Sequence, residues 1–259
     1  MADTQGLALG VDFGGSGIKA APVDLRTGDF TADRVRLETP VPATPEAVAA
    51  VVAELVDGAG VPEDCPVGIT VPGVVKGGTV HTAANIDRGW IGADAAALFS
   101  EVVRHPVTVV NDADAAGLAE ARYGAAAGVA GLVVVTTLGT GIGSALVHDG
   151  TLVPGSELGH LEVDGHDAES RAANRVREEE GLSWSDWAAL LTRYYRAVER
   201  VLWPDLFVVG GGVSKHAASF LPLLDISTPA VPATLRNRAG IVGAALLAGQ
   251  GVGLPLPPA

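Results

Sequence analysis

An Asn-Asp pair follows a short run of β-branched residues near the middle of the chain. Asn111 and Asp112 come directly after Val109-Val110, and the small residues that follow predict a helix. The pair therefore falls at the carboxyl end of a strand, where open α/β sheets bind their ligands. A carboxylate there can accept the proton of a hydroxyl group, and the neighbouring amide can orient that hydroxyl. The alternative is that Asp112 or Asp114 only caps the helix, a position that aspartate favours.

Two glycine-rich turns each lie between a pair of predicted strands. The first joins residues 7–13 to residues 18–23, and the second joins residues 131–138 to residues 145–147. Glycine lets the backbone approach a ligand closely, and successive amide groups in such a turn can hold a phosphate. The repeated pattern suggests two similar domains that face a cleft, each with a phosphate-binding turn. Coincidental glycine hairpins are the alternative.

The first turn also carries polar side chains that suit a phosphate. The hydroxyl of Ser16 can donate to it, and Lys19 is a compact cation that can reach it. Asp12 can hold magnesium, either directly or through water. The spacing differs from that of a Walker loop, and a strand follows the turn. We therefore expect a hairpin that binds phosphate.

The stretch from residue 157 to residue 169 mixes carboxylates and histidines with apolar residues. Four of these side chains could bind a metal, but neither a helical histidine pair nor a cysteine supports that interpretation. Carboxylates and imidazoles in a shallow loop also suit hydrogen bonds to sugar hydroxyls, which is the interpretation we prefer. The four candidate metal ligands are His160, Asp164, His166 and Glu169.

Three further features carry weaker signals. Asn85 lies in a polar loop and could bond a sugar hydroxyl, although most loop asparagines only satisfy their own turn. Three glycines at 210–212 follow a predicted strand and permit close approach to a phosphate or a purine. A helix from Ser183 to about Leu202 carries three arginines on one face, which a solvated basic face explains. These arginines are Arg193, Arg196 and Arg200.

The composition limits the class of protein. The chain has 259 residues, of which 48% are hydrophobic and only 5% aromatic, so its core must be built from Ala, Val and Leu, as in helices on a buried sheet. Its net charge of −13 argues against general binding to nucleic acid or anionic membranes. A single cysteine, Cys65, excludes an internal disulfide and a multi-cysteine zinc site. No signal-like start and no apolar run of about 18 residues is present, so we expect a cytoplasmic protein.

Five motifs, taken in order, resemble those of the ROK family of sugar kinases. They are DFGGSGIK at 12–19, NDADAAG at 111–117, TLGTGIGSAL at 137–146, ELGHLEVDGH at 157–166 and VVGGGVS at 208–214. The resemblance implies an α/β, actin-like (ribonuclease H-like) ATPase fold with two domains around a cleft. It also implies a homodimer. We expect the domains to span residues 1–108 and 109–259, with a last helix over about 240–249 that packs back on the first domain.

The resemblance further implies roles for individual residues. Asp112 would be the base that accepts the proton of the glucose 6-hydroxyl, and Asp12 would position Mg²⁺. The residues expected to contact the sugar, besides Asp112, are Thr70, Pro72, Gly73, Asn85, Asn111, Glu157, His160 and Glu169. The residues expected to contact the donor phosphates, besides Asp12, are Gly14, Gly15, Ser16, Gly17, Lys19, Thr137, Gly139, Thr140 and Gly141. Gly210, Gly211 and Gly212 would lie beside a nucleotide.

One departure from the family pattern favours a particular branch. Most members carry a cysteine-rich zinc loop after the Gly-His element, whereas GHDAESRAANR at 165–175 has no cysteine, so no zinc is expected. The chain resembles the branch that phosphorylates glucose with inorganic polyphosphate, which shares the serine of the first turn. We therefore expect phosphoryl transfer from polyphosphate, ATP or both to the 6-hydroxyl of glucose.

Two other functions compete with this one. The first is an ATP-only kinase for glucose, mannose or an N-acetylated hexose. The second is a non-catalytic, sugar-sensing regulator. It is disfavoured because a first strand near residue 7 leaves no room for a helix-turn-helix and because the acidic charge opposes DNA binding. A polyphosphate track would need basic residues along one groove. The candidates are Lys19, Lys76, Arg88, Arg193, Arg196 and Lys215.

Overall fold

The computed structural model describes residues 6–83 and 86–253. The chain forms two compact units. One contains the chain up to Ala119 and returns at Arg238, and the other contains residues 120–237. The boundary expected from the sequence falls earlier, after residue 108, because the long-range pairing of the next strand with the first sheet leaves no mark in the sequence.

The first unit is built on a six-stranded sheet. Its main path runs β3-β2-β1-β5-β8, and β4 also pairs with β2. The pairing of β1 with β2 is antiparallel, whereas β1, β5 and β8 are parallel. The strands are β1 (Leu7–Gly14), β2 (Gly17–Asp24), β3 (Asp29–Phe30), β4 (Val35–Leu37), β5 (Val67–Val71) and β8 (Val107–Asn111), and a separate hairpin consists of β6 (Val75–Lys76) and β7 (Thr79–Val80).

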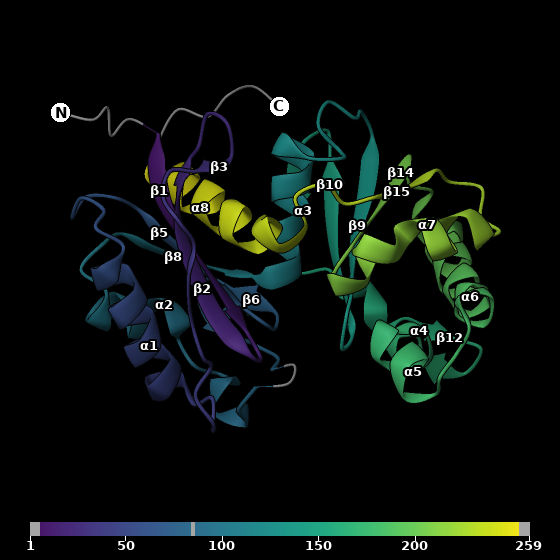
Figure 1. Ribbon diagram of the computed structural model, residues 1–259, viewed down its shortest axis with the longest axis horizontal. Coiled ribbons are helices and arrows are strands. Elements are labelled where there is room, and N and C mark those ends of the chain that lie inside the picture. The colour runs from purple at the N-terminus through teal and green to yellow at the C-terminus, as the bar shows by residue number, and fades with distance from the viewer. Residues whose placement is uncertain (1–5, 84–85, 254–259) are drawn as a thin grey trace. The chain divides into compact units, whose positions relative to one another are not determined.

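Helices cover both faces of this sheet (Figure 1). On one face, α1 (Pro45–Gly58) and α2 (Ala95–Val102) bury Val48, Val52 and Phe99 in one cluster with residues of β1 and β5. On the other face, α8 (Ala239–Gly251) lies directly against backbone, because a Cβ atom on Gly10 or Gly68 would collide with its carbonyl groups. A short 3₁₀ helix, η1 (Arg88–Trp90), places Trp90 in the first cluster.

The second unit is built on a five-stranded sheet in the order β11-β10-β9-β14-β15. The pairing of β9 with β10 is antiparallel, and β9, β14 and β15 are parallel. Both units therefore contain a glycine hairpin next to parallel strands, as the repeated sequence pattern predicts. The strands of this sheet are β9 (Leu132–Leu138), β10 (Ile142–His148), β11 (Thr151–Val153), β14 (Leu206–Gly210) and β15 (Ala230–Pro232).

The long helix α6 (Trp184–Leu202) packs apolar side chains against one face of this second sheet. Ser183 caps its first turn by accepting a hydrogen bond from the amide of Asp186, as the sequence predicts. Its buried face includes Trp187 and Tyr195, which share a cluster with residues of β9 and β14. The shorter elements of the unit are η2 (Leu158–His160), β12 (Glu162–Val163), β13 (His166–Asp167), α4 (Glu169–Ala172), α5 (Asn174–Glu179), η3 (Gly212–His216), α7 (Ala217–Phe220) and η4 (Leu221–Leu223).

Two elements lie where the chain passes between the units. Helix α3 (Asp112–Tyr123) begins in the first unit, and η5 (Arg236–Arg238) precedes α8. Among the described residues, no helix is both long enough and apolar enough to cross a membrane.

Candidate active site

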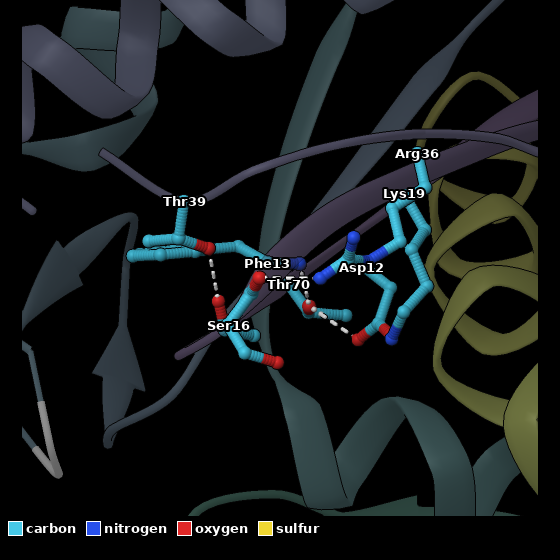
Figure 2. A network of polar contacts seen from close by, with 8 residues as sticks. Asp12, Phe13, Ser16, Lys19, Arg36, Thr39 and Thr70 are labelled. Atoms are coloured by element: carbon cyan, nitrogen blue, oxygen red, sulfur yellow. Dashed lines mark hydrogen bonds and ion pairs between the residues drawn. The ribbon is translucent and has the colours of Figure 1, made fainter. Parts of the chain in front are cut away.

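The first glycine turn is the tip of the β1–β2 hairpin, and its carbonyl groups are tied to the segment that contains β4. Gly14 pairs with Gly17, so Gly15 and Ser16 form the turn. The hydroxyl of Thr39 donates to the carbonyl of Gly14 at 2.6 Å, and Nη2 of Arg36 donates to the carbonyl of Ser16 at 2.6 Å (Figure 2). Both carbonyl oxygens therefore already have donors, which weakens their repulsion of an approaching anion.

A row of polar side chains crosses four strands beside this turn. Strand pairing places Thr70, Asp12, Lys19 and Arg36 next to one another on β5, β1, β2 and β4. Nζ of Lys19 lies 3.2 Å from Oδ2 of Asp12. The structure thus brings together Asp12 and Lys19, which the sequence predicts as phosphate-site residues.

Thr70 also holds Asp12, and the start of α8 lies close to it. The hydroxyl of Thr70 donates to its Oδ1 at 3.3 Å, and a Cβ atom on Gly240, at the start of α8, would lie 2.7 Å from that oxygen. The Thr70 hydroxyl is fully buried and accepts from the amide of Phe13 at 3.0 Å. Both of its hydrogen bonds are therefore made to residues of strand β1.

Asn111 connects the end of β8 to two neighbouring segments. Its Nδ2 donates to the carbonyl of Gly73 at 2.9 Å, and its Oδ1 accepts from the amide of Asp114 at 2.9 Å. The second bond is that of a helix N-cap. The cap of α3 is therefore Asn111, and the alternative in which Asp112 or Asp114 has this role is wrong. The first bond also brings the Pro72-Gly73 turn to the strand end.

Asp112 is the first residue of α3 and is half-buried. Its Oδ1 accepts from the amide of Ala113 at 2.9 Å. The start of a helix favours a negative charge, because the first amide groups point toward it. The carboxylate predicted as the catalytic base is thus held next to Asn111. Asn85, the remaining sugar residue predicted in the first half of the chain, lies outside the described residues.

In the second unit, the second glycine turn and the triple glycine lie side by side. Thr137 on β9 is paired with Gly210 on β14. Gly211 has a φ of 83°, and a Cβ atom there would collide with the backbone of Leu138. The turn itself is closed by a bond from the amide of Gly139 to the carbonyl of Gly141 at 3.0 Å. The two segments expected near the donor thus meet within one unit.

The predicted sugar loop packs against the strand that follows this turn. A Cβ atom on Gly159 would collide with the carbonyl of Ile142, and the amide of Leu158 donates to Oγ of Ser144 at 2.9 Å. Oε2 of Glu169 accepts from the amide of Ile142 at 3.0 Å. The loop that carries Glu157 and His160 therefore contacts the end of the second turn.

His160 and Asp167 form a hydrogen-bonded pair, with 2.8 Å between Nδ1 and Oδ2. This bond, opposed by partial burial and helped by the carboxylates of Glu169 and Glu157, raises the pKa of His160. Oδ1 of Asp167 accepts from the amide of Glu169 at 3.2 Å. One aspartate thus orients two of the predicted sugar residues.

Only two of the four side chains weighed as metal ligands come together. The ligand atoms of His160, Asp167 and Glu169 lie within 4.8 Å of one another and could hold a metal ion. Asp164 instead pairs with Arg193 at 3.0 Å, and His166 contacts Arg171 at 3.1 Å. These latter four side chains line part of a cavity of about 270 Å³, which none of the predicted sugar residues lines.

The basic helix face agrees with the solvated interpretation. Arg193 pairs with Asp164, and Arg196 pairs with Asp225, all with exposed side chains. Three side chains that the sequence argument did not select are Arg36, Thr39 and Asp167. Asp167 lies within the acidic stretch singled out from the sequence, whereas Arg36 and Thr39 lie outside every motif. Strand pairing reveals the place of Arg36, and the hydrogen bond to Gly14 reveals that of Thr39.

Two α/β units, each with a glycine hairpin beside parallel strands, define a protein of the actin-like ATPase class. Within that class, the ROK family model matches residues 8–180, and the chain belongs to the ROK family. The family resemblance read from the five motifs is confirmed.

The relatives that match most of the chain include kinases with named substrates. The chain is 54% identical over 246 residues to the polyphosphate glucokinase of Mycobacterium tuberculosis (strain CDC 1551 / Oshkosh), covering 95% of this chain and 92% of that protein. It matches the inorganic polyphosphate/ATP-glucomannokinase of Arthrobacter sp. strain KM with a TM-score of 0.90 and 53% identity, covering 95% and 99% of the two chains. A ROK family glucokinase of Streptomyces griseus, solved with glucose and AMPPNP, matches with a TM-score of 0.81 and 27% identity, covering 95% and 100%.

Proposed function

We propose that the protein is a glucokinase that transfers a phosphoryl group from inorganic polyphosphate, and also from ATP, to the 6-hydroxyl of glucose. The observation that carries this proposal is the 54% identity to a polyphosphate glucokinase over 95% of the chain. The name of the Arthrobacter enzyme supports both donors, and it favours mannose as a second acceptor.

The base in this proposal is Asp112, which accepts the proton of the 6-hydroxyl as the oxygen attacks the donor phosphorus. The bond from the amide of Ala113 fixes its carboxylate, and the neutral Asn111 takes over the capping of α3. Glu157, His160 and Glu169 bind the other hydroxyls. Phosphoryl transfer depends mainly on alignment and charge stabilisation, so positioning these groups is most of the catalytic task.

Asp12 suits a hydrated magnesium ion. Its carboxylate oxygens have more acceptor positions than the bonds from Lys19 and Thr70 occupy. The adjacent ammonium of Lys19 disfavours direct contact with a second cation, whereas Mg²⁺ usually keeps several of its waters. When bound, Mg²⁺ would neutralise charge on the donor phosphates. Lys19 and the amide groups of the two glycine turns would hold those phosphates.

The donor assignment is tested by measuring glucose 6-phosphate formation with magnesium and glucose, using polyphosphate and ATP in parallel. We expect product from both donors and mutual competition between them. Product from ATP alone would remove the polyphosphate assignment, and product from neither would reject the glucokinase assignment.

Substitution of Asp112 tests the base. We expect Asp112→Ala and Asp112→Asn to lower kcat by at least ~100-fold, the lower end of what general-base catalysis contributes. The thermal midpoint should fall only slightly, because Asn111 keeps the cap of α3 while the bond to the Ala113 amide is weakened or lost. Turnover within tenfold of the wild type in either variant would reject Asp112 as the base.

The family resemblance also supports a homodimer that acts in the cytoplasm with no nucleic-acid partner. Light scattering coupled to size-exclusion chromatography measures the molar mass. A mass equal to that of one 26.1 kDa chain at micromolar concentration would reject the dimer.

A further inference from the structure

We propose that Arg36 binds the phosphate chain of the donor beside the first glycine turn. The inference rests on the proposed function, because it names a further residue at the donor side of the same site. The ligand is a chain of linked phosphates, which polyphosphate and ATP share. Four features of the structure carry it: the place of Arg36 on the sheet, the anchoring of its side chain, its lack of a carboxylate partner and the fit of guanidinium to phosphate.

Arg36 lies directly opposite Lys19 in the pairing of β4 with β2. Opposite residues of an antiparallel pair share one face of the sheet, and like charges in such positions are destabilising. Asp12 forms an ion pair with Lys19. One carboxylate thus stands beside two cations, and an anionic ligand would offset the remaining positive charge. Figure 2 shows the two basic side chains next to each other beside Asp12.

The guanidinium group of Arg36 is held on the turn itself. Nη2 donates to the carbonyl of Ser16 at 2.6 Å. A Cβ atom on Gly17 would overlap Nε of Arg36 and would lie 2.8 Å from its Cζ, so the glycine makes room for the group. The exposed side chain is therefore already held at one point next to the predicted phosphate site, which lowers the entropy lost on binding.

In the part of the chain that the structure describes, Arg36 has no carboxylate partner, whereas several other arginines of this acidic chain do. Arg26, Arg193, Arg196 and Arg238 each form an ion pair with an aspartate. Within residues 6–83 and 86–253, the only side-chain hydrogen bond found for Arg36 is the one to the Ser16 carbonyl, and it forms no ion pair. A guanidinium has five N–H donors in a planar fork, so most of them remain for a ligand.

These properties suit a phosphate. The guanidinium fork matches two phosphate oxygens, and the resulting charge-assisted hydrogen bonds are stronger than neutral ones. Thr39 and Arg36 also occupy the carbonyls of Gly14 and Ser16, which would otherwise repel an anion. Lys19 and Arg36 together would hold neighbouring phosphates of one chain.

The test compares Arg36→Gln, Arg36→Lys and a charge-matched control, Arg104→Gln. Glutamine can still donate to the Ser16 carbonyl but carries no charge, and lysine keeps the charge without the fork. Arg104 is an exposed arginine in the turn after α2, outside the proposed site. For each protein we would measure kcat, KM for polyphosphate, ATP and glucose, the dependence of donor KM on salt, and the thermal midpoint.

We expect Arg36→Gln to raise the KM for each donor used by about tenfold or more, the size expected for a lost charged hydrogen bond. The KM for glucose and the thermal midpoint should stay near the wild-type values, and Arg36→Lys should recover part of the loss. Donor KM should rise less steeply with salt in Arg36→Gln, because one charged contact is gone. Arg104→Gln should match the wild type.

A donor KM in Arg36→Gln equal to that of Arg104→Gln would overturn the proposal, as would a loss confined to kcat or to the thermal midpoint. These results leave the glucokinase assignment intact. If the wild type uses only ATP, the same comparison with ATP decides. If neither donor yields product, the proposed function fails by itself. In that case, calorimetric titration with polyphosphate tests the proposal for Arg36. Equal binding by the wild type and Arg36→Gln, or no binding by the wild type, would overturn it, whereas weaker binding by Arg36→Gln would support it.

Discussion

At the scale of single residues, the proposed base in the first unit and the proposed sugar-binding histidine in the second unit are supported in the same way. Asn111 caps helix α3, and the amide of Ala113 fixes the neighbouring carboxylate of Asp112, which we propose as the base. Asp167 similarly holds the imidazole of His160 through Nδ1. In both places a supporting polar group fixes a neighbour that we assign to the substrate. Such support restricts the orientation of the working group before the sugar arrives.

The pair of His160 and Asp167 gives a pH-dependent prediction. In Asp167→Asn we expect the pKa of His160 to fall toward its ordinary value of about 6.5, because the largest cause of its rise is removed. A raised folded-state pKa adds stability below the unfolded value, and this stability is lost as pH rises through the folded pKa. The wild type should therefore exceed the variant in stability fully below about pH 6.5 and lose this advantage as pH rises through the raised folded-state pKa. The margin should be small, because both side chains are largely exposed.

NMR titration of the imidazole resonances checks this prediction. The matched control is Asp149→Asn, which changes another exposed aspartate beside a histidine and should leave the titration of His160 unaltered. Identical His160 titration curves in the wild type and Asp167→Asn would show that the hydrogen bond does not persist in solution.

At the scale of elements, the contact of α8 with the first sheet depends on glycine. Gly10 on β1 and Gly68 on β5 face the helix, and Gly243 on the helix faces the backbone of Ala115. Each of these glycines allows two backbone segments to lie in direct contact, because it has no side chain to keep them apart. The start of α8 thereby comes to lie beside Asp12. A helix remote in sequence thus helps to shape the first phosphate site.

Gly68→Ala should accordingly destabilise the first unit. The added methyl would collide with the carbonyl of Ala244, and neither the strand nor the helix backbone can yield without separating. Overpacking of this kind typically costs about 1–3 kcal/mol, which urea unfolding followed by circular dichroism would measure. Gly58→Ala is the matched control. It has open space at the end of α1, so alanine should be neutral or stabilising there. Equal midpoints for the two variants would contradict the close packing of α8.

At the scale of the whole molecule, the chain passes between the two units after Ala119 and again after Asn237. Glu120 stands beside the first passage. Its buried carboxylate accepts from the amides of Ala125, Thr234 and Leu235, so both passages are anchored on the second unit. The sequence places Glu120 only in a helix, because nothing in it reveals a partner 114 residues away.

The sequence predicts contacts between near neighbours in the chain and does not predict contacts between distant segments. Local features such as the cap at Ser183, Pro45 at the start of α1 and the glycine hairpins are visible, because they depend on neighbouring residues. The order of motifs then identifies the family. The row from Asp12 to Arg36 depends on the register of β4, and the contact of Gly68 with α8 depends on a helix about 170 residues later. Both are consequences of long-range packing.

Cys65 allows the first unit to be followed within the intact chain, because it is the single cysteine. It is buried, and burial raises the pKa of its thiol from 9.0 to about 11. At pH 8 the thiolate, which is the reactive form, should be about a hundredfold scarcer than in an ordinary thiol, and burial slows attack further. We therefore expect very slow reaction with Ellman's reagent in the native protein and rapid reaction in urea. Rapid stoichiometric labelling without urea, at the rate of a small thiol, would mean that the strand-end region around Cys65 opens while the rest of the molecule stays folded.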